Sequence, residues 1–292
     1  MNITSRFAEE PILTNLKTNS LILVAMLAFA ANSLLCRMAM SVADMEPGDF
    51  TVVRLLSGAL MLILLGSVKQ KSWRNKEGSW PGALCLFIYA AAFSFAYQGM
   101  TTGTGALLLF GAVQITMLLV SFFRGERFSK PQLLGFNLAV GGLLILLLPG
   151  ASSPDPLSAA LMISAGVAWG AYTLLGKGAS KPLLLSAGNF LRSLVFVPPL
   201  FFTLEAGLSI SVADSGFIYA VLSGAIASGA GYAIWYSVLP SLSGPQAATI
   251  QLSVPVLAMI MGWLALSEAI TLQMALAGGI TLGGIFLVIR AR

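Results

Sequence analysis

Ten apolar stretches, each about as long as a membrane-spanning helix, follow one another along the chain with short polar breaks between them. A helix that crosses the hydrocarbon core of a bilayer needs about 20 apolar residues. The stretches lie near residues 19–41, 48–68, 80–98, 103–123, 131–149, 157–177, 184–204, 214–237, 244–265 and 271–290. This pattern predicts an all-α membrane protein with ten transmembrane helices and leaves almost no chain for a separate soluble domain.

Two of these helices carry signals for their first residues. Ser129 with Gln132 three positions later matches a capping box, and Asp155 before Pro156 matches a cap followed by a proline at the first helical position. We therefore expect helices to begin at these two points.

The charged residues divide between the two sets of connecting segments. All but three of the 16 Lys and Arg residues fall in segments that share a side with the N-terminus, whereas the opposite loops carry only acidic residues such as Asp44, Glu46 and Asp214. Because Lys and Arg accumulate in cytoplasmic loops, we expect a multi-pass protein of a bacterial inner (plasma) membrane with both termini cytoplasmic. The net charge of +5 belongs to this face and needs no nucleic-acid partner.

Composition removes several kinds of chemistry. Hydrophobic residues make up 57% of the chain and charged residues 9%, against about 25% charged residues in a soluble domain. The chain has no histidine, which excludes His–metal sites and Ser–His–Asp catalysis. Cys36 and Cys85 both lie within apolar stretches, so no disulfide framework is expected. We expect no catalytic residue, no metal and no cofactor.

The sequence also contains an internal repeat that covers both halves of the chain. Thr104–Glu126 and Gln246–Glu268 share their pattern 142 residues apart, and each ends in a small residue and a glutamate. Further matched pairs, 138 to 140 residues apart, are Phe29 with Trp169, Asn32 with Tyr172, Ser33 with Thr173, Arg37 with Lys177, Arg54 with Arg192 and Tyr97 with Tyr236. Since five spans is an odd number, residues 1–150 and 151–292 would form two inverted five-helix repeats of one membrane domain. Such repeats place a substrate site near the membrane midplane.

Two motifs within this frame carry a family resemblance. Trp-Gly-Ala-Tyr-Thr at residues 169–173 opens the second half, and Pro255-Val with Ser267-Glu268 closes the ninth stretch. With the five-plus-five arrangement they resemble the drug/metabolite transporter superfamily over the whole chain, and within it the EamA-type exporters, above all exporters of aromatic amino acids. The resemblance implies export of small metabolites by alternating access. Val113 departs from the pattern of this family, since such exporters often have a proline at this position. We therefore expect a straighter fourth helix.

Aromatic residues recur at helical spacing within three stretches. They are Tyr89, Phe93 and Tyr97 in the third, Trp169 and Tyr172 in the sixth, and Tyr232 and Trp235 in the eighth. Trp and Tyr often form belts at the membrane interface, and packing between helices is a second reading. Their depth within the spans favours a substrate cavity, in which rings with polar tips suit a ligand with an apolar body and a charged backbone.

Polar residues within the stretches supply further candidates for substrate binding. Asn32, Gln246 and Gln251 could line the cavity or form hydrogen bonds between helices. Pro255 has no N–H, so the carbonyl of Gln251 loses its helical partner. We expect a kink there that serves the site or a gate.

The remaining in-span features are read as structural. Arg54 and Arg192 are expected to act as tethers and Arg37 is left open, with a substrate carboxylate as the other reading. Gly279 and Gly283 form a small-xxx-small pattern that predicts close packing of the tenth helix. Glu268, like its counterpart Glu126, is expected in a loop or cap.

The sequence therefore predicts an exporter whose partners are a small molecule, most of all an amino acid, and the lipid bilayer. A membrane-embedded enzyme lacks the His, Ser–His or paired in-span Asp motifs it would need. A channel or a scaffold protein would not need an inverted repeat or aromatic residues at helical spacing, so these features disfavour both alternatives. Another substrate, such as a drug cation, finds no deep carboxylate. The sequence does not decide the coupling ion or the oligomeric state, for which a monomer is one possibility.

Overall fold

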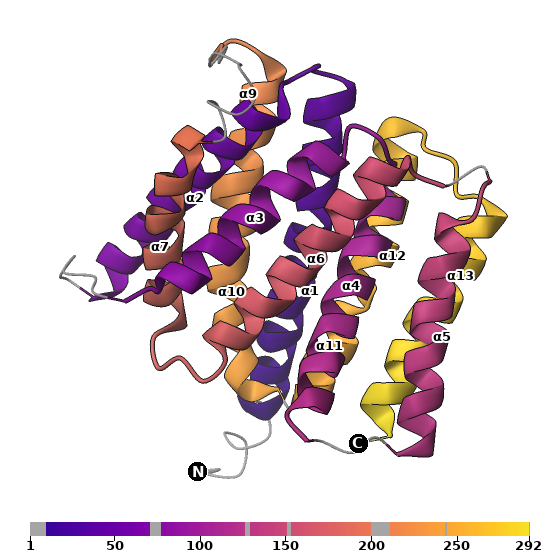
Figure 1. Ribbon diagram of the computed structural model, residues 1–292. Helices are drawn as coiled ribbons and strands as arrows, with labels where there is room; N and C mark the ends of the chain where they lie inside the picture. Colours follow the sequence, from indigo (N-terminus) through magenta and orange to yellow (C-terminus); the bar gives the residue numbers. More distant parts are fainter. Residues whose placement is uncertain are drawn as a thin grey trace, which may run out of the picture.

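The computed structural model describes residues 10–70, 77–125, 129–150, 153–199, 211–242 and 244–291, and its regular elements within these ranges are all helices (Figure 1). In chain order they are α1 (Glu10–Ser41), α2 (Pro47–Gln70), α3 (Trp80–Ala96), α4 (Thr102–Phe123), α5 (Lys130–Leu147), α6 (Pro156–Gly176), α7 (Pro182–Ser193), η1 (Leu194–Phe196), α9 (Ser215–Val221), η2 (Leu222–Ala230), α10 (Gly231–Val238), η3 (Leu239–Ser241), α11 (Gly244–Gln251), α12 (Ser253–Leu266) and α13 (Leu272–Arg290).

Among the described residues, eight helices are long and apolar enough to cross a membrane. The shorter helix α3 is equally apolar, and the seventh predicted helix is described only as far as residue 199. Large apolar side chains face outward where lipid would lie, with Leu60, Phe123 and Leu264 exposed to 66%, 80% and 69%. The prediction of an all-α membrane protein is confirmed, while ten crossings stay a prediction.

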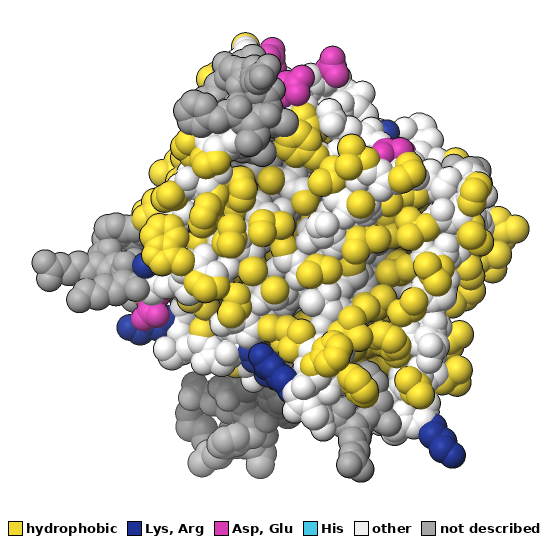
Figure 2. All heavy atoms as spheres, viewed as in Figure 1, with side chains coloured by type: hydrophobic (Ala, Val, Ile, Leu, Met, Phe, Trp, Pro, Cys, Tyr) yellow, Lys and Arg dark blue, Asp and Glu magenta, His cyan; other side chains and the backbone are white. Residues whose placement is uncertain are grey.

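The two ends of the molecule differ in charge. Helix α1 begins and helix α13 ends at the lower end in Figure 1. Figure 2 shows a broad band of apolar side chains across this face, with most Lys and Arg side chains below it and most Asp and Glu side chains above it. We call these the basic end and the acidic end.

Both predicted helix starts are confirmed. The backbone N–H of Ser129 donates to Gln132 Oε1 at 2.8 Å, which forms the expected capping box of α5. The backbone N–H of Ser158 donates to Asp155 Oδ1 at 3.0 Å at the start of α6. Hydrogen bonds from Ser158 also lower the pKa of the exposed Asp155 carboxyl, because they stabilise its charged form.

The helices pack in a pattern that relates the two halves of the chain. Helix α1 packs against α9, η2 and α10, just as α6 packs against α3. Helix α1 also contacts α12, just as α6 contacts α4, while α5 and α13 pack against each other. Each half therefore wraps its first helix in helices from the other half.

The glycine prediction for the tenth helix is wrong in its register. A Cβ added at Gly279 or Gly283 would meet open space. The close approach of α13 to α5 runs instead through Gly284, where an added Cβ would meet the Gly135 carbonyl, and through Gly142 opposite Thr281. The contact face therefore includes Gly284 and not Gly283. Small residues occupy it on both helices, which lets the two backbones approach closely.

Two helices of the second half are irregular. The ninth predicted helix is divided into α11 and α12 at Leu252, whereas α4 runs unbroken past Val113. The eighth contains η2, a nine-residue π-helix that the sequence analysis did not foresee. Within it Gly224 has no room for a side chain, since an added Cβ would meet the carbonyl of Arg54 in α2. Turns of this kind occur often at functional sites.

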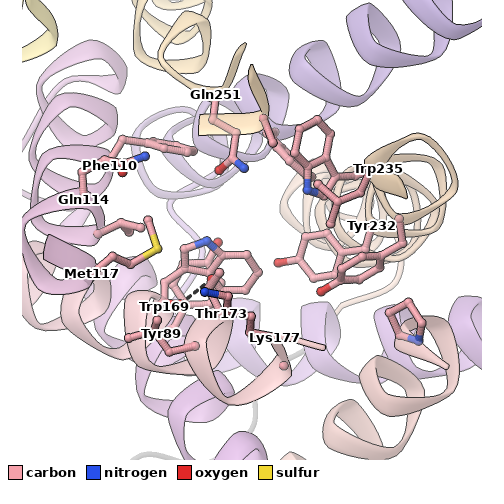
Figure 3. Close-up of a pocket in the computed structure, with 18 of the residues that line it drawn as sticks. Tyr89, Phe110, Gln114, Met117, Trp169, Thr173, Lys177, Tyr232, Trp235 and Gln251 are labelled. Carbon is pink, nitrogen blue, oxygen red and sulfur yellow. Dashed lines mark hydrogen bonds between the residues drawn. The ribbon is translucent and has the colours of Figure 1, made fainter. Parts of the chain in front are cut away.

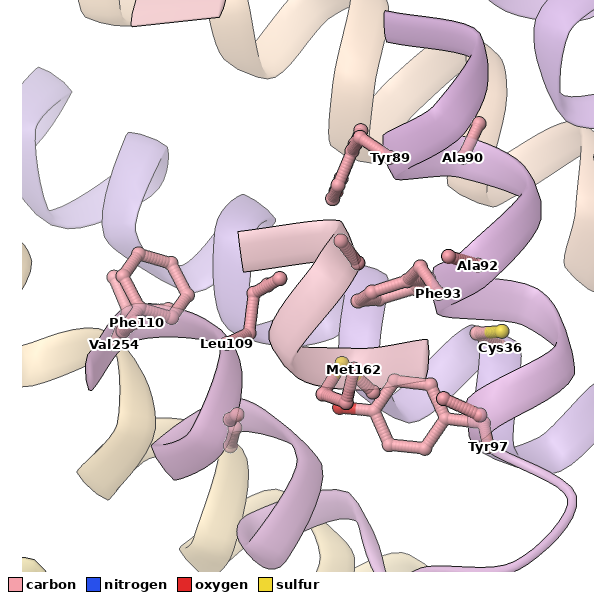
Figure 4. Close-up of a cluster of buried hydrophobic side chains, with 14 of the residues drawn as sticks. Cys36, Tyr89, Ala90, Ala92, Phe93, Tyr97, Leu109, Phe110, Met162 and Val254 are labelled. Carbon is pink, nitrogen blue, oxygen red and sulfur yellow. The ribbon is translucent and has the colours of Figure 1, made fainter. Parts of the chain in front are cut away.

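Figure 4 shows a cluster of buried apolar side chains that contains several aromatic rings. Phe93 and Tyr97 follow Tyr89 along α3 and are fully buried, with their rings edge to face at 4.8 Å. Tyr97 Oη donates to the Thr102 carbonyl at 3.3 Å, and Met162 of α6 is fully buried in the same cluster. These contacts join α3 to the start of α4 and to α6.

Candidate functional site

A cavity of about 510 Å³ lies among helices of both halves (Figure 3). Side chains from α1, α3, α4, α6, η2, α10, α11 and α13 line it. At one end the lining includes Lys177, just after α6, and Ile289 near the end of α13. The cavity therefore extends to the basic end of the molecule.

Aromatic rings form one wall of this cavity. The ring of Trp169 lies 4.7 Å from that of Tyr89 and 5.3 Å from that of Tyr232, measured between centroids. Phe29 packs edge to face on Tyr232 and Trp235 at 5.8 and 6.2 Å. All five side chains belong to the lining. They come from α1, α3, α6 and α10, so the wall exists only when helices from both halves meet.

Polar side chains form a corner beside this wall. Tyr89 Oη accepts hydrogen bonds from Arg54 Nη2 at 2.7 Å and from Asn32 Nδ2 at 3.2 Å. Asn32 Oδ1 in turn accepts from Ser223 Oγ of η2 at 2.7 Å. Each of these four side chains is at least nine-tenths buried. Buried polar groups need such partners, since an unpaired one costs about 1–3 kcal/mol.

Further polar groups of the lining include Ser228, Gln114 and Gln251. Within the part of the chain that is described, the buried Oγ of Ser228 has no hydrogen-bond partner. The interruption of the ninth helix follows directly after Gln251, which points into the cavity. These side chains place amide and hydroxyl groups in the same lining as the aromatic wall.

A cluster of polar contacts surrounds Glu268 at the acidic end. Its carboxylate forms an ion pair with Arg37 at 3.3 Å and accepts the backbone N–H of Thr102 at 2.8 Å. Arg37 Nη1 also donates to the Tyr97 carbonyl at 2.8 Å. Glu268 thus caps the start of α4, as expected of a cap residue, and ties α1 and α4 to the end of α12. Its counterpart Glu126 lies outside the described residues.

The three in-span arginines have different surroundings. Arg192 Nη1 donates to the Glu77 and Gly188 carbonyls at 2.7 and 3.1 Å, which is the arrangement of a tether. Arg37 is likewise tied to Glu268 and to backbone carbonyls. Arg54 is 2% exposed and lies beside the cavity, behind Tyr89. Its hydrogen bond to Tyr89 joins α2 to α3, so the tether interpretation stays a prediction, now for a residue next to the cavity.

The structure brings most of the predicted site residues together. Asn32, Tyr89, Trp169, Tyr232, Trp235 and Gln251 all line the cavity. Phe93, Tyr97 and Tyr172 do not, because they lie behind the wall in the protein interior. Tyr172 stacks on Trp169 at 5.1 Å and donates to Ser186 Oγ at 3.4 Å. The side chain of Gln246 lies outside what the structure describes.

Several lining residues were not among those predicted. Phe110 and Met117 of α4 belong to this group, as do Phe29 and Lys177. The repeat could have identified Phe29, since it matches Trp169. Phe110 and Met117 have no sequence signal that separates them from the other apolar residues of α4.

The chemistry of the site is that of binding. The described residues hold no group of three or more His, Cys, Asp or Glu side chains that could bind a metal. Among the lining residues that the structure describes, the only charged side chain is that of Lys177. Rings, amides, hydroxyls and one ammonium group can hold a small molecule that is partly apolar and not cationic.

Comparisons with known proteins agree with this arrangement. The model of the EamA-like transporter family matches the chain twice, over residues 16–148 and 156–290. A Pseudomonas aeruginosa protein is 52% identical over 276 residues, covering 94% of this chain and 96% of that protein. The threonine/homoserine exporter RhtA of Escherichia coli is 29% identical, covering 78% of this chain and 77% of that one.

Two further similarities are more distant. A probable terminal-alkyne amino-acid exporter of Streptantibioticus cattleyicolor is 25% identical over 72% of this chain and 71% of its own. One solved crystal structure superposes with a TM-score of 0.65 at 17% identity, covering 93% of this chain and 97% of that chain. At this identity the structural match speaks for the fold alone.

Proposed function

Since the chain belongs to the EamA-like transporter family of the drug/metabolite transporter superfamily, and is a membrane transporter and not an enzyme, we propose that it exports neutral amino acids, aromatic ones among them. One observation carries this proposal: the cavity combines seven aromatic rings with amides and hydroxyls, and its described lining residues include no carboxylate. Its volume of about 510 Å³ falls within the roughly 300–1,000 Å³ of small-molecule sites.

Relatives support the same substrate class. The two exporters named above carry amino acids by their printed names. A neutral amino acid needs an apolar surface for its side chain and polar partners for its backbone, and this cavity offers both. An organic cation would find Lys177 and no acidic group among the lining residues, so this alternative is disfavoured.

Alternating access is the proposed mechanism. Family matches over both halves and the reciprocal packing of α1 and α6 support two inverted five-helix repeats, residues 1–150 and 151–292. The cavity extends to the basic end, while Glu268 binds both Arg37 and the backbone N–H of Thr102 at the acidic end. Inverted repeats let the two ends open in turn around one site. Export would then require the Arg37–Glu268 ion pair to separate when the acidic end opens.

The direction of transport depends on the orientation in the membrane. Lys and Arg mark the cytoplasmic side, so the basic end and both termini are proposed to face the cytoplasm across the bacterial inner membrane. Reporter fusions after Lys181 and Arg292 should then report the cytoplasm, and a fusion near Asp155 the outside. A cytoplasmic signal near Asp155 would overturn this orientation.

The substrate proposal is tested with the purified full-length protein in liposomes. Preloaded unlabelled L-phenylalanine should drive counterflow of labelled L-phenylalanine and, more weakly, of labelled threonine. Empty liposomes and the Trp169→Ala variant are the controls. Counterflow indistinguishable from that of empty liposomes with every neutral amino acid tested would exclude the proposal.

A further inference from the structure

The hydroxyl of Tyr89 has an unusual set of partners. A phenol oxygen can accept hydrogen bonds and donate one. Here Arg54 Nη2 and Asn32 Nδ2 both donate to this oxygen, at 2.7 and 3.2 Å. Ser223 donates to Asn32 Oδ1 at 2.7 Å, which turns the amide so that its NH₂ group faces Tyr89. The hydrogen-bonding capacity left to Tyr89 is therefore its own proton.

The Tyr89 hydroxyl can donate this proton to a group in the cavity. Tyr89 is one of the lining residues and is 4% exposed (Figure 3). In the described part of the chain, no acceptor receives a hydrogen bond from its hydroxyl, and its neighbours at that oxygen are both donors. A ligand in the cavity would therefore meet a hydroxyl that can only donate.

Arg54 places a positive charge directly behind this hydroxyl. Arginine stays protonated in proteins, and its guanidinium carbon lies 4.9 Å from the ring centroids of Tyr89 and Phe93. Its Nη1 atom is buried without a hydrogen-bond partner in the described residues. A hydrogen bond from a cationic donor polarises the hydroxyl that accepts it, and hydrogen bonds in a chain strengthen one another. The corner as a whole favours a ligand with a negative charge.

We propose that Tyr89 donates a hydrogen bond to a carboxylate of the substrate, and that Arg54 is a positioning residue that acts through Tyr89. The inference rests on the proposed function, because the carboxylate is the group that all amino acids share. It adds which corner of the cavity holds that group: the substrate carboxylate faces Tyr89 and Asn32, and the apolar side chain lies along Trp169 and Tyr232.

The test uses three probes with the same ring. L-Phenylalanine carries both charged groups, 3-phenylpropionate lacks the amine, and L-phenylalaninamide lacks the carboxylate. Each is measured as a competitor of labelled L-phenylalanine counterflow and by quenching of tryptophan fluorescence in the purified full-length protein. The variant is Tyr89→Phe, which keeps the ring. The control is Tyr219→Phe, which removes a hydroxyl from α9 outside the lining.

A hydrogen bond to a charged group changes affinity by about ten- to hundredfold. Tyr89→Phe should therefore weaken binding of L-phenylalanine and 3-phenylpropionate by about this factor and leave L-phenylalaninamide within about twofold. Tyr219→Phe should change none of the three. An equal loss for all three probes, or no loss for any, would overturn the inference.

Arg54 is tested by a pair of variants. Arg54→Met removes the charge and should reproduce the carboxylate-selective loss, while Arg54→Lys should restore part of it. If Arg54→Met does not fold, the selectivity of Tyr89→Phe and of Arg54→Lys decides the question. A wild-type protein that transports no amino acid would refute the proposed function alone. In that case 3-phenylpropionate binding still tests the corner, since it must weaken in Tyr89→Phe.

Discussion

Helix α4 and the pair α11–α12 correspond by the sequence repeat, yet only one of them is continuous. Helix α4 runs unbroken from Thr102 to Phe123, whereas its counterpart is interrupted at Leu252. The matched positions are Val113, which has a backbone N–H, and Pro255, which has none. The continuous helix thus has a hydrogen-bond donor at this position, and the interrupted helix, which breaks just after Gln251, has none.

The matched arginines show the same divergence between the halves. Arg192 is tied to backbone carbonyls of Glu77 and Gly188. Arg54 instead supports Tyr89 at the cavity. The two halves therefore share a helical plan but differ in helix continuity and in the partners of their matched arginines. Substitutions at matched positions can test whether these differences divide the proposed roles in scaffold, gating and ligand recognition between the halves.

The largest effect is expected from Val113→Pro in α4. A proline within a helix removes a hydrogen bond and its ring strikes the preceding turn, at a cost of about 3 kcal/mol or more. Because α6 packs closely on α4, we expect a strongly lowered Tm and little folded protein. Val113→Ala keeps the N–H and loses only buried apolar contact, so it should lower the Tm much less than Val113→Pro. A stable, active Val113→Pro protein would mean that α4 tolerates the break found in its counterpart.

The matched pair Trp169 and Phe29 tests the aromatic wall. Trp169→Ala removes ring contacts with Tyr89 and Tyr232 and buried apolar surface, together a roughly ten- to hundredfold loss of affinity for L-phenylalanine. Phe29→Ala should cost less, because its ring is smaller and lies further from its neighbours. Threonine should lose less than phenylalanine in both variants. Competition in counterflow measures these affinities, and equal losses for both substrates would mean that the rings only pack helices.

Arg192→Ala should affect stability and not specificity. It removes hydrogen bonds from a charged group to the Glu77 and Gly188 carbonyls, worth about 1–2 kcal/mol at this partly buried site. We expect a lower Tm and an unchanged ranking of amino acids in competition assays. A changed ranking would give Arg192 a part in recognition and remove the contrast with Arg54.

The smallest effect is expected from Pro255→Ala. The new N–H can restore a helical hydrogen bond to the Gln251 carbonyl, worth about 0.5–1.5 kcal/mol, and so stiffen the hinge. Counterflow should slow a few fold while the affinity for L-phenylalanine stays the same. Pro156→Ala, at the first position of α6 where no helical donor is needed, is the control. Unchanged counterflow rates would reduce Pro255 to a packing residue.

Much of the fold and of the site was predictable from local rules. The apolar stretches, the caps at Ser129 and Asp155 and the interruption near Pro255 depend on neighbours within a few residues. Six of the predicted binding residues line the cavity, because aromatic and amide side chains deep in apolar helices have few other uses. Phe93 and Tyr97 illustrate the limit, since they follow Tyr89 at helical spacing and yet lie in the interior.

The sequence by itself determined the helical class, the helix starts, the charge difference between the two ends and the repeat, because each depends on composition or on spacing along one chain. Only the tertiary structure decided which face of each helix meets the cavity, that Gly284 and not Gly283 contacts α5, and that Glu268 pairs with Arg37. The pairing of Arg54 with Tyr89 and Asn32 was decided there too. These features join residues far apart in the chain, and their energies depend on distances and burial that exist only once the helices have packed.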